Sequence, residues 1–198
     1  QYSLAAHGAA FTPSAAISPY LRQAIVAIED HRFYRHNGID PRGILRAAVV
    51  DVTQRGVDQG GSTLEEQLAK RAIVGDDATI HGKLRTMAIA WALDQDFSKE
   101  RILTLYLNDA YYGRGAYGPQ EAARTYFGVD AVRLTLPQAA FLAALPQAPS
   151  VFGANPLGAA VQSRYRTVLM DMVQQGMITA SEERSALDTR LTFALPNP

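Results

Sequence analysis

Apolar residues along this chain of 198 residues recur mainly every three or four positions, the spacing of one helix face. The first such stretch opens at Ser18 and Pro19, where proline suits the first helical turn, and is predicted to end within 29–35. A second helix is predicted from Asp40 to about Arg55. The alternation typical of a β-strand is scarce, so the pattern predicts an all-α fold.

The later helices are predicted from caps and helix-breaking residues. The segment from Thr63 to Glu66 has the pattern of a capping box and opens a short helix, which Gly75 ends. Two glycine-rich segments, 56–61 and 111–118, are predicted loops, where binding groups are often found. The remaining helices are predicted over 78–94, from Ser98 through Tyr106, and over 119–127, 136–145, 157–175 and 180–187.

Composition narrows the possible classes of protein. Apolar residues make up 47% of the chain, which is enough for a core in a single domain of 198 residues. The absence of cysteine excludes disulfides, thiol catalysis and cysteine-ligated zinc. The 19 basic and 19 acidic residues balance, so the basic excess of a nucleic-acid-binding protein is missing. The four histidines lack the spacing of a metal motif, and no apolar run is long enough to cross a bilayer.

The first candidate for chemistry lies at the end of the opening helix. Glu29 would lie one turn after Ile25, on the same face, where a carboxylate could act as a general base. The alternative is that Glu29 and Asp30 form a solvated helix end with neighbouring arginines. The local pattern alone leaves both interpretations open.

A second candidate begins at Ser62 and Thr63. Backbone amides and hydroxyl groups at a helix start suit an anion such as phosphate, and Lys70 follows about two turns later. Lys83, further along the chain, could pair with a pyrophosphate. The plainer interpretations are an ordinary capped helix and a lysine that extends along a helix surface into solvent.

Taken together and in this order, the motifs resemble those of the family 51 glycosyltransferases, the polymerase domains of penicillin-binding proteins and monofunctional transglycosylases. The resemblance runs from about Ile17 to Leu187. Its segments are Glu29-Asp30-x-x-Phe33-x-x-His36-x-Gly38, Gly60-Gly61-Ser62-Thr63-x-x-x-Gln67-x-x-Lys70, Tyr106-Leu107-Asn108, Tyr112-Gly113, Tyr117-Gly118, Glu121-Ala122-Ala123, Ala143-Ala144-Leu145-Pro146-x-x-Pro149 and Arg164 with Val168-Leu169.

The resemblance implies a lysozyme-like helical fold with a large lobe and a smaller, membrane-facing jaw lobe at about 38–75. It implies that lipid II is polymerised into β-1,4-linked glycan strands with release of undecaprenyl pyrophosphate. Glu29 would be the general base that takes the proton of the acceptor hydroxyl. The residues implied at the donor and pyrophosphate site are Ser62, Thr63, Gln67, Lys70 and Lys83, and the other motif residues are Asp30, Phe33, His36, Gly38, Thr86, Asn108 and Arg164.

The same resemblance implies partners and a location. The partners would be lipid II, the growing glycan strand, the membrane surface and other cell-wall synthesis proteins, and no nucleic acid. The location would be the outer face of the bacterial plasma membrane, periplasmic or extracytoplasmic, with an anchoring helix before Gln1. Some family members use a divalent cation such as Mg²⁺ or Mn²⁺ near the pyrophosphate, but the sequence offers no separate metal-ligand cluster.

The sequence departs from the family pattern at the donor site. The third motif normally reads Arg-Lys-x-x-Glu, and here Gly82 and Thr86 replace the arginine and the glutamate. The second motif normally has Gln-Gln, where this chain has Glu66 and Gln67. An active polymerase and a weak or inactive relative that binds lipid II or glycan as a scaffold therefore both remain open. A lysozyme-like hydrolase is disfavoured by the match to the basic pyrophosphate positions.

Overall fold

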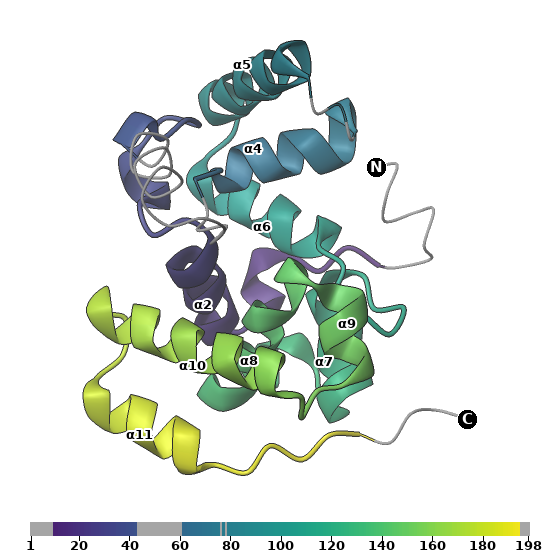
Figure 1. Ribbon diagram of the computed structural model, residues 1–198, viewed down its shortest axis with the longest axis vertical. Helices are drawn as coiled ribbons and strands as arrows, with labels where there is room; N and C mark the ends of the chain where they lie inside the picture. Colours follow the sequence, from purple (N-terminus) through teal and green to yellow (C-terminus); the bar gives the residue numbers. More distant parts are fainter. Residues whose placement is uncertain (1–9, 43–60, 76, 78, 195–198) are drawn as a thin grey trace. The chain divides into compact units, whose positions relative to one another are not determined.

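The computed structural model describes residues 10–42, 61–75, 77 and 79–194. These residues form helices and connecting loops without any β-strand, so the prediction of an all-α fold is confirmed (Figure 1). The chain divides into two compact units, residues 1–28 with 107–198 and residues 29–106. The predicted jaw lobe, 38–75, falls inside the second unit. No helix among the described residues is long and apolar enough to span a membrane.

Helix α2, Pro19–Glu29, begins where Ser18 and Pro19 predict it. Ser18 is buried, and its hydroxyl donates to the Leu134 carbonyl at 2.9 Å, which fixes the start of the helix within the first unit. Leu21 and the run from Ala24 to Ala27 are buried. The helix ends at Glu29, inside the predicted range, and this residue is the first of the second unit.

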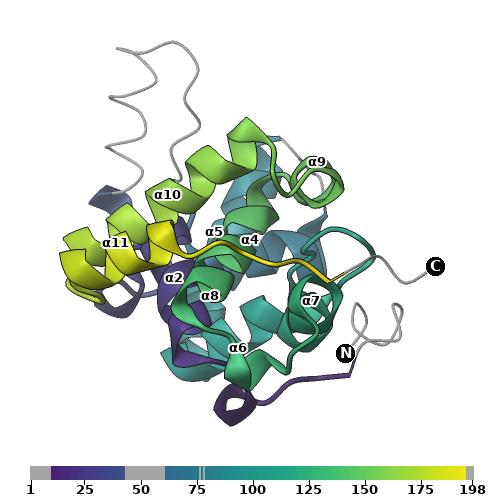
Figure 2. The same cartoon turned by 90° about the horizontal axis from the view of Figure 1, so that it is seen from below.

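The core of the first unit is built around α8, Leu136–Ala144, which is apolar on nearly all sides and almost entirely buried. It contacts α7 (Gly118–Phe127), α10 (Ala159–Gln174) and α11 (Ala180–Asp188) (Figure 2). Aromatic rings extend this core, with Phe141 in contact with Tyr126, Phe127 and Phe193. A further short helix, α9 (Pro149–Ala154), has no counterpart in the sequence prediction.

The second unit is built on two packed helices, α4 (Leu64–Ala69) and α5 (Ile80–Asp96), which lie side by side (Figure 1). Each starts at a threonine cap: Thr63 accepts from the Glu66 amide and Thr79 from the Gly82 amide, both at 3.1 Å. A π-helical turn, Lys70–Val74, extends α4, and a 3₁₀ turn covers Phe33–Arg35. Helix α6, Lys99–Asp109, belongs to this unit as far as Tyr106.

Some predictions fall partly or wholly on residues that are not described. Pro41 and Arg42 are helical, and the rest of the helix predicted to run to Arg55 lies outside the described residues. The same holds for the predicted loop 56–61 up to Gly60, and for Ala78, the first residue of the predicted third helix. The later predicted helices match α6, α7, α8, α10 and α11, with ends that differ by one to a few residues.

Candidate functional site

Asp30 ties the end of α2 to the beginning of α4. Its buried carboxylate accepts from the Leu64 amide at 3.1 Å and lies 2.8 Å from His36 Nε2. A carboxylate at a helix N-terminus satisfies an amide that has no partner within the helix and complements the helix dipole. Asp30 and His36 therefore act as a framework that holds Glu29 near α4.

Gly38 brings the same segment against α5. Its φ is +78°, and a Cβ there would lie 2.4 Å from the Ala90 carbonyl oxygen, so a side chain has no room. The Gly38 carbonyl accepts from the Thr63 hydroxyl at 2.7 Å. Thr63 thus joins the first motif to the cap of α4, which is a positioning role inside the unit.

An ionic cluster around the buried Glu65 of α4 adds to this framework. Lys99 Nζ lies 2.7 Å from Glu65 Oε1 and 2.6 Å from Asp94 Oδ1, and 4.8 Å from the centre of the Phe33 ring. Phe33 and Glu65 are fully buried. Burial raises the pKa of Glu65, while its hydrogen bond and charge pairing with Lys99 act in the opposite direction.

Asp30, His36 and Glu65 form the group among the described residues that could offer ligands to a metal, with ligand atoms within 4.8 Å of one another. The Lys99 ammonium already binds Glu65, and Asp30 already accepts from the Leu64 amide and lies within hydrogen-bonding distance of His36. A cation placed there would be repelled by Lys99 and would have to break these contacts. The cluster fits a structural network better than a metal site.

The raised pKa of Glu65 predicts how the free energy of unfolding depends on pH. Because its pKa in the folded protein is raised above 4.5, the folded state holds this proton more tightly than the unfolded chain. The resulting stabilisation is present below pH 4.5 and is lost as the pH rises through the folded pKa. We expect Glu65→Gln to flatten the fall in unfolding free energy over that window, measured by urea unfolding at a series of pH values. Parallel curves for the two proteins would contradict it.

Glu29 lies half-buried at the end of α2 and is held by a chain of hydrogen bonds. Gln67 Nε2 donates to Glu29 Oε2 at 3.0 Å, and the Tyr106 hydroxyl donates to Gln67 Oε1 at 3.1 Å. The Arg71 guanidinium stacks over the Tyr106 ring at 4.4 Å from its centre. Gln67 is thus fixed in orientation and presents its amide to the carboxylate.

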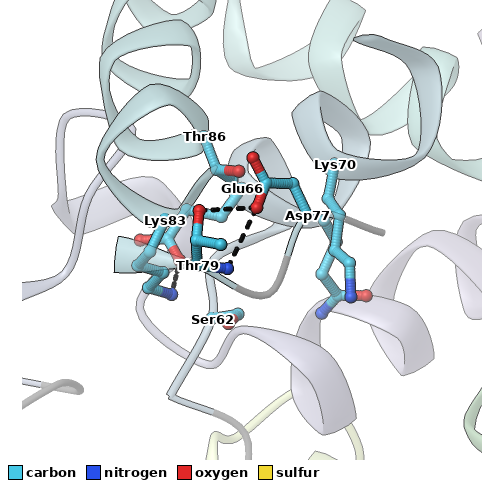
Figure 3. A pocket seen from close by; sticks show the side chains of 8 residues that line it. Ser62, Glu66, Lys70, Asp77, Thr79, Lys83 and Thr86 are labelled. Atoms are coloured by element: carbon cyan, nitrogen blue, oxygen red, sulfur yellow. Dashed lines mark hydrogen bonds and ion pairs between the residues drawn. The ribbon is translucent and has the colours of Figure 1, made fainter. Parts of the chain in front are cut away.

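Gln67 also lines a cavity of about 220 Å³ in the second unit. The cavity lies beside α4 and α5 and the turn that precedes α5 (Figure 3). Its lining residues are Ser62, Glu66, Gln67, Lys70, Asp77, Thr79, Lys83 and Thr86. Four residues predicted for the donor site, Ser62, Gln67, Lys70 and Lys83, are therefore brought together, whereas Thr63 is buried beside them in its capping role.

The two departures in the third motif both lie at this cavity or next to it. Thr86 lines it, and its hydroxyl donates to the Gly82 carbonyl at 2.9 Å. The space where a Gly82 side chain would lie is taken by Asp77, whose carbonyl oxygen would be 2.3 Å from a Cβ. The Asp77 carboxylate accepts from the Thr79 amide and hydroxyl, at 3.0 and 2.6 Å, and these bonds lower its pKa.

Because of this packing, we expect Gly82→Ala to lower the free energy of unfolding, which is the opposite of its usual effect in a helix. Alanine normally stabilises a helix by roughly 1 kcal/mol relative to glycine. Here the added Cβ must displace Asp77, so we expect a net loss of roughly 1–2 kcal/mol from the overlap. Urea unfolding of both proteins measures it, and a gain in stability would contradict it. For the same reason Gly82→Arg would disturb the cavity instead of restoring an arginine to it.

Two predicted motif residues lie in the other unit. Asn108 is fully buried, accepting from the Thr12 amide at 2.7 Å and donating to the Thr12 carbonyl at 2.9 Å. It therefore holds the segment before α2 within the first unit. Arg164 lies on α10, where its charge opposes the burial that raises the pKa of Asp171.

A second cavity, of about 480 Å³, lies around the first motif in the same unit as Glu29. Its lining includes Arg32, Arg35, Arg42 and the ring of Trp91, and Arg32 pairs with Asp40 at 3.4 Å. Arginine side chains together with an indole surface suit an anionic or sugar-bearing ligand.

Sequence reasoning did not place Asp77, Thr79 or Tyr106 in the site. The pattern Asp77-x-Thr79 before an apolar run is a recognisable helix start, so the local signal for the first two was present. The contact of Tyr106 with Gln67 spans 39 residues and has no local signal.

The family model and the similar proteins point to the same family. Residues 3–173 match the family model described as Transglycosylase. A penicillin-binding protein 1A of Neisseria gonorrhoeae is 39% identical over 185 residues, covering 92% of this chain and 23% of the relative. That of Aquifex aeolicus is 38% identical over 181 residues, covering 91% and 25%.

A crystal structure of penicillin-binding protein 1A from Haemophilus influenzae matches with a TM-score of 0.46 and 37% identity, over 50% of this chain and 15% of that one. The chain spans about a quarter of the length of the curated relatives named above, whose covered shares are 23% and 25%.

Proposed function

The chain belongs to the transglycosylase family, and on that premise we propose that it polymerises lipid II into β-1,4-linked glycan strands, releasing undecaprenyl pyrophosphate. The observation that carries the proposal is the link between Glu29 and the cavity. Gln67 donates to Glu29 Oε2 and lines a cavity that also holds Lys70 and Lys83. The candidate base, Glu29, and the candidate anion site are thus connected through the side chain of Gln67.

Glu29 is proposed as the general base. Its carboxylate takes the proton of the acceptor sugar hydroxyl as that oxygen attacks the anomeric carbon of the donor. The attack comes from the face opposite the pyrophosphate and inverts the configuration at that carbon. Gln67 orients the carboxylate through its hydrogen bond to Oε2, and the carboxylate accepts the hydroxyl proton.

Lys70 and Lys83 are proposed to bind the departing pyrophosphate. Negative charge grows on the leaving oxygen as the glycosidic bond to phosphate breaks, and a cation fixed nearby lowers the barrier. Ser62 adds a hydroxyl donor at the same cavity. The transition state at the donor sugar should resemble an oxocarbenium ion.

The outer surface of α5 supports contact with a membrane. Ile80, Leu84 and Trp91 lie on one side of the helix and are 78%, 59% and 54% exposed. Met87 lies on the same side of the helix and is half-buried. A stripe of large apolar side chains ending in tryptophan suits the interface of a bilayer. The proposed location is the outer face of the bacterial plasma membrane, next to other cell-wall synthesis proteins.

The test is polymerisation by the purified protein. Incubation with lipid II in detergent is expected to give glycan strands that migrate as a ladder and are cut by a muramidase. Accumulation of undecaprenyl pyrophosphate at the rate at which disaccharides are added to the strands would show that the carrier is the leaving group. Intact lipid II after prolonged incubation would contradict the proposal.

The second candidate is a scaffold that binds lipid II or glycan without joining sugars. The observation that favours it is Thr86, which cannot ionise and lines the cavity where the family carries a carboxylate. This candidate predicts saturable binding of lipid II with no ladder, and binding that is unaffected by Glu29→Gln.

A further inference from the structure

The described lining of the 220 Å³ cavity is balanced in formal charge. It contains two lysines, Lys70 and Lys83, and two carboxylates, Glu66 and Asp77. Asp77 is occupied by the Thr79 amide and hydroxyl at the start of α5, and these bonds lower its pKa, so it remains charged. A cavity that is to take an anion therefore has no net positive charge among these residues.

Within this lining, Glu66 forms an ion pair with Lys83. Its side chain is 1% exposed, and its Oε2 lies 2.9 Å from the Lys83 ammonium, whose side chain is 52% exposed. Among the described residues, the other oxygen, Oε1, is buried without a hydrogen-bond partner. The buried carboxylate thus binds the partly exposed lysine, and both side chains line the cavity (Figure 3).

We propose that Glu66 is an internal counter-ion that competes with a phosphate-bearing ligand for Lys83 and thereby sets the affinity of the cavity for pyrophosphate. The inference rests on the proposed function in one respect, namely that this cavity takes the pyrophosphate group.

Charge and geometry determine whether the Glu66 carboxylate raises or lowers the affinity for pyrophosphate. An ammonium has three N–H groups, and Lys83 gives one to Glu66 among the residues that the structure describes. A phosphate oxygen that binds the remaining N–H groups comes close to the Glu66 carboxylate, and the two negative charges repel each other. The carboxylate also restrains the flexible lysine, but we expect the repulsion of a ligand with two or more negative charges to outweigh that gain in order. Removing the charge of Glu66 should therefore tighten binding.

The position of Glu66 also bears on the divergent third motif. Glu66 on α4 and Thr86 on α5 line the same cavity, and Thr86 stands where the resemblance implies a carboxylate. The negative charge of the cavity is thus supplied from the facing helix. A carboxylate returned to position 86 would lie one helical turn from Lys83, where it could pair with that lysine.

The test is binding of inorganic pyrophosphate, measured by isothermal titration calorimetry at low and at moderate salt. We expect E66Q to bind about tenfold more tightly than the unchanged protein, which corresponds to about 1.4 kcal/mol. The advantage should shrink as salt rises, because screening weakens both attraction and repulsion. Loss of folded protein can only weaken binding, so a gain cannot arise from structural damage.

Three further variants test whether the tighter binding of E66Q comes from the pair of Glu66 and Lys83. E65Q removes the neighbouring buried carboxylate, which is paired with Lys99 and does not line the cavity, and should leave the affinity unchanged. E66Q/K83M should lose the gain, because the competing cation is gone. E66Q/T86E returns a carboxylate from α5 and should bring the affinity back toward that of the unchanged protein.

The outcomes separate the inference from the proposed function. If the unchanged protein binds pyrophosphate and E66Q binds it equally or more weakly, the counter-ion role is wrong while the pyrophosphate site stands. If E65Q tightens binding as much as E66Q, the cause is the change in net charge of the protein and not the contact with Lys83, and the inference is again wrong. If neither the unchanged protein nor E66Q binds pyrophosphate at millimolar concentration, the pyrophosphate site itself is wrong, and the proposed function loses its leaving-group pocket.

Discussion

Glu29→Gln is expected to abolish glycan polymerisation, with a fall in the rate constant of at least ~100-fold. General base catalysis contributes typically 10²–10⁴-fold, and glutamine cannot take up the proton of the acceptor hydroxyl. The replacement keeps the size of the side chain, and its amide can still pair with Gln67 after a flip, so the fold around α2 should persist. Continuous release of undecaprenyl pyrophosphate from lipid II measures the effect.

The control for this prediction is Glu100→Gln, which changes an exposed carboxylate in the first turn of α6 that lines neither described cavity. It should polymerise at the rate of the unchanged protein. Binding of lipid II should survive in Glu29→Gln, because the lysines of the cavity are untouched. A Glu29→Gln protein that still makes strands at more than a tenth of the normal rate would assign the base to another group.

Gly38→Ala is expected to have the largest effect on stability, a loss of about 3 kcal/mol in the unfolding free energy of the second unit. Part of the loss comes from the backbone, since a φ of +78° disfavours any residue with a Cβ by roughly 1–2 kcal/mol. The rest comes from overlap with the α5 backbone, where the Ala90 carbonyl oxygen would lie 2.4 Å from the new atom. Urea unfolding followed by circular dichroism measures the change.

Gly128→Ala provides the matched comparison. Gly128 ends α7 in the left-handed conformation with a φ of +67°, and no atom lies within 4 Å of a Cβ there. This variant should lose only the backbone part, about 1 kcal/mol. Equal losses in the two variants would show that the close approach of Gly38 to α5 does not contribute.

The sequence anticipated most of the helix ends because the signals are local. Proline at the start of α2 and threonine at the starts of α4 and α11 act within four residues through backbone hydrogen bonds. The π-helical turn Lys70–Val74 and the short helix α9 were missed. Neither has a distinct local pattern, since the first continues α4 and the second has only six residues.

The sequence named residues for the candidate site, but it did not show the contacts that connect them. Ser62, Gln67, Lys70 and Lys83 do share one cavity. Several other motif residues turn out to support the framework: Asp30 caps α4, Gly38 admits the α5 backbone, and Asn108 holds the segment before α2. Such roles cannot be read from residue type, because a buried carboxylate that caps a helix and one that takes a proton look alike in a sequence.

By itself, the sequence determined that the chain is helical, where most helices begin, and which side chains are chemically able to take a proton or bind an anion. These properties depend on backbone preferences and residue types within a few positions. Only the tertiary structure decided that Glu66 pairs with Lys83, that Asp77 fills the space beside Gly82, and that Gln67 joins Glu29 to the cavity. The physical reason is that packing of α4 against α5 brings together groups whose energies depend on distance and burial, and separation along the chain fixes neither.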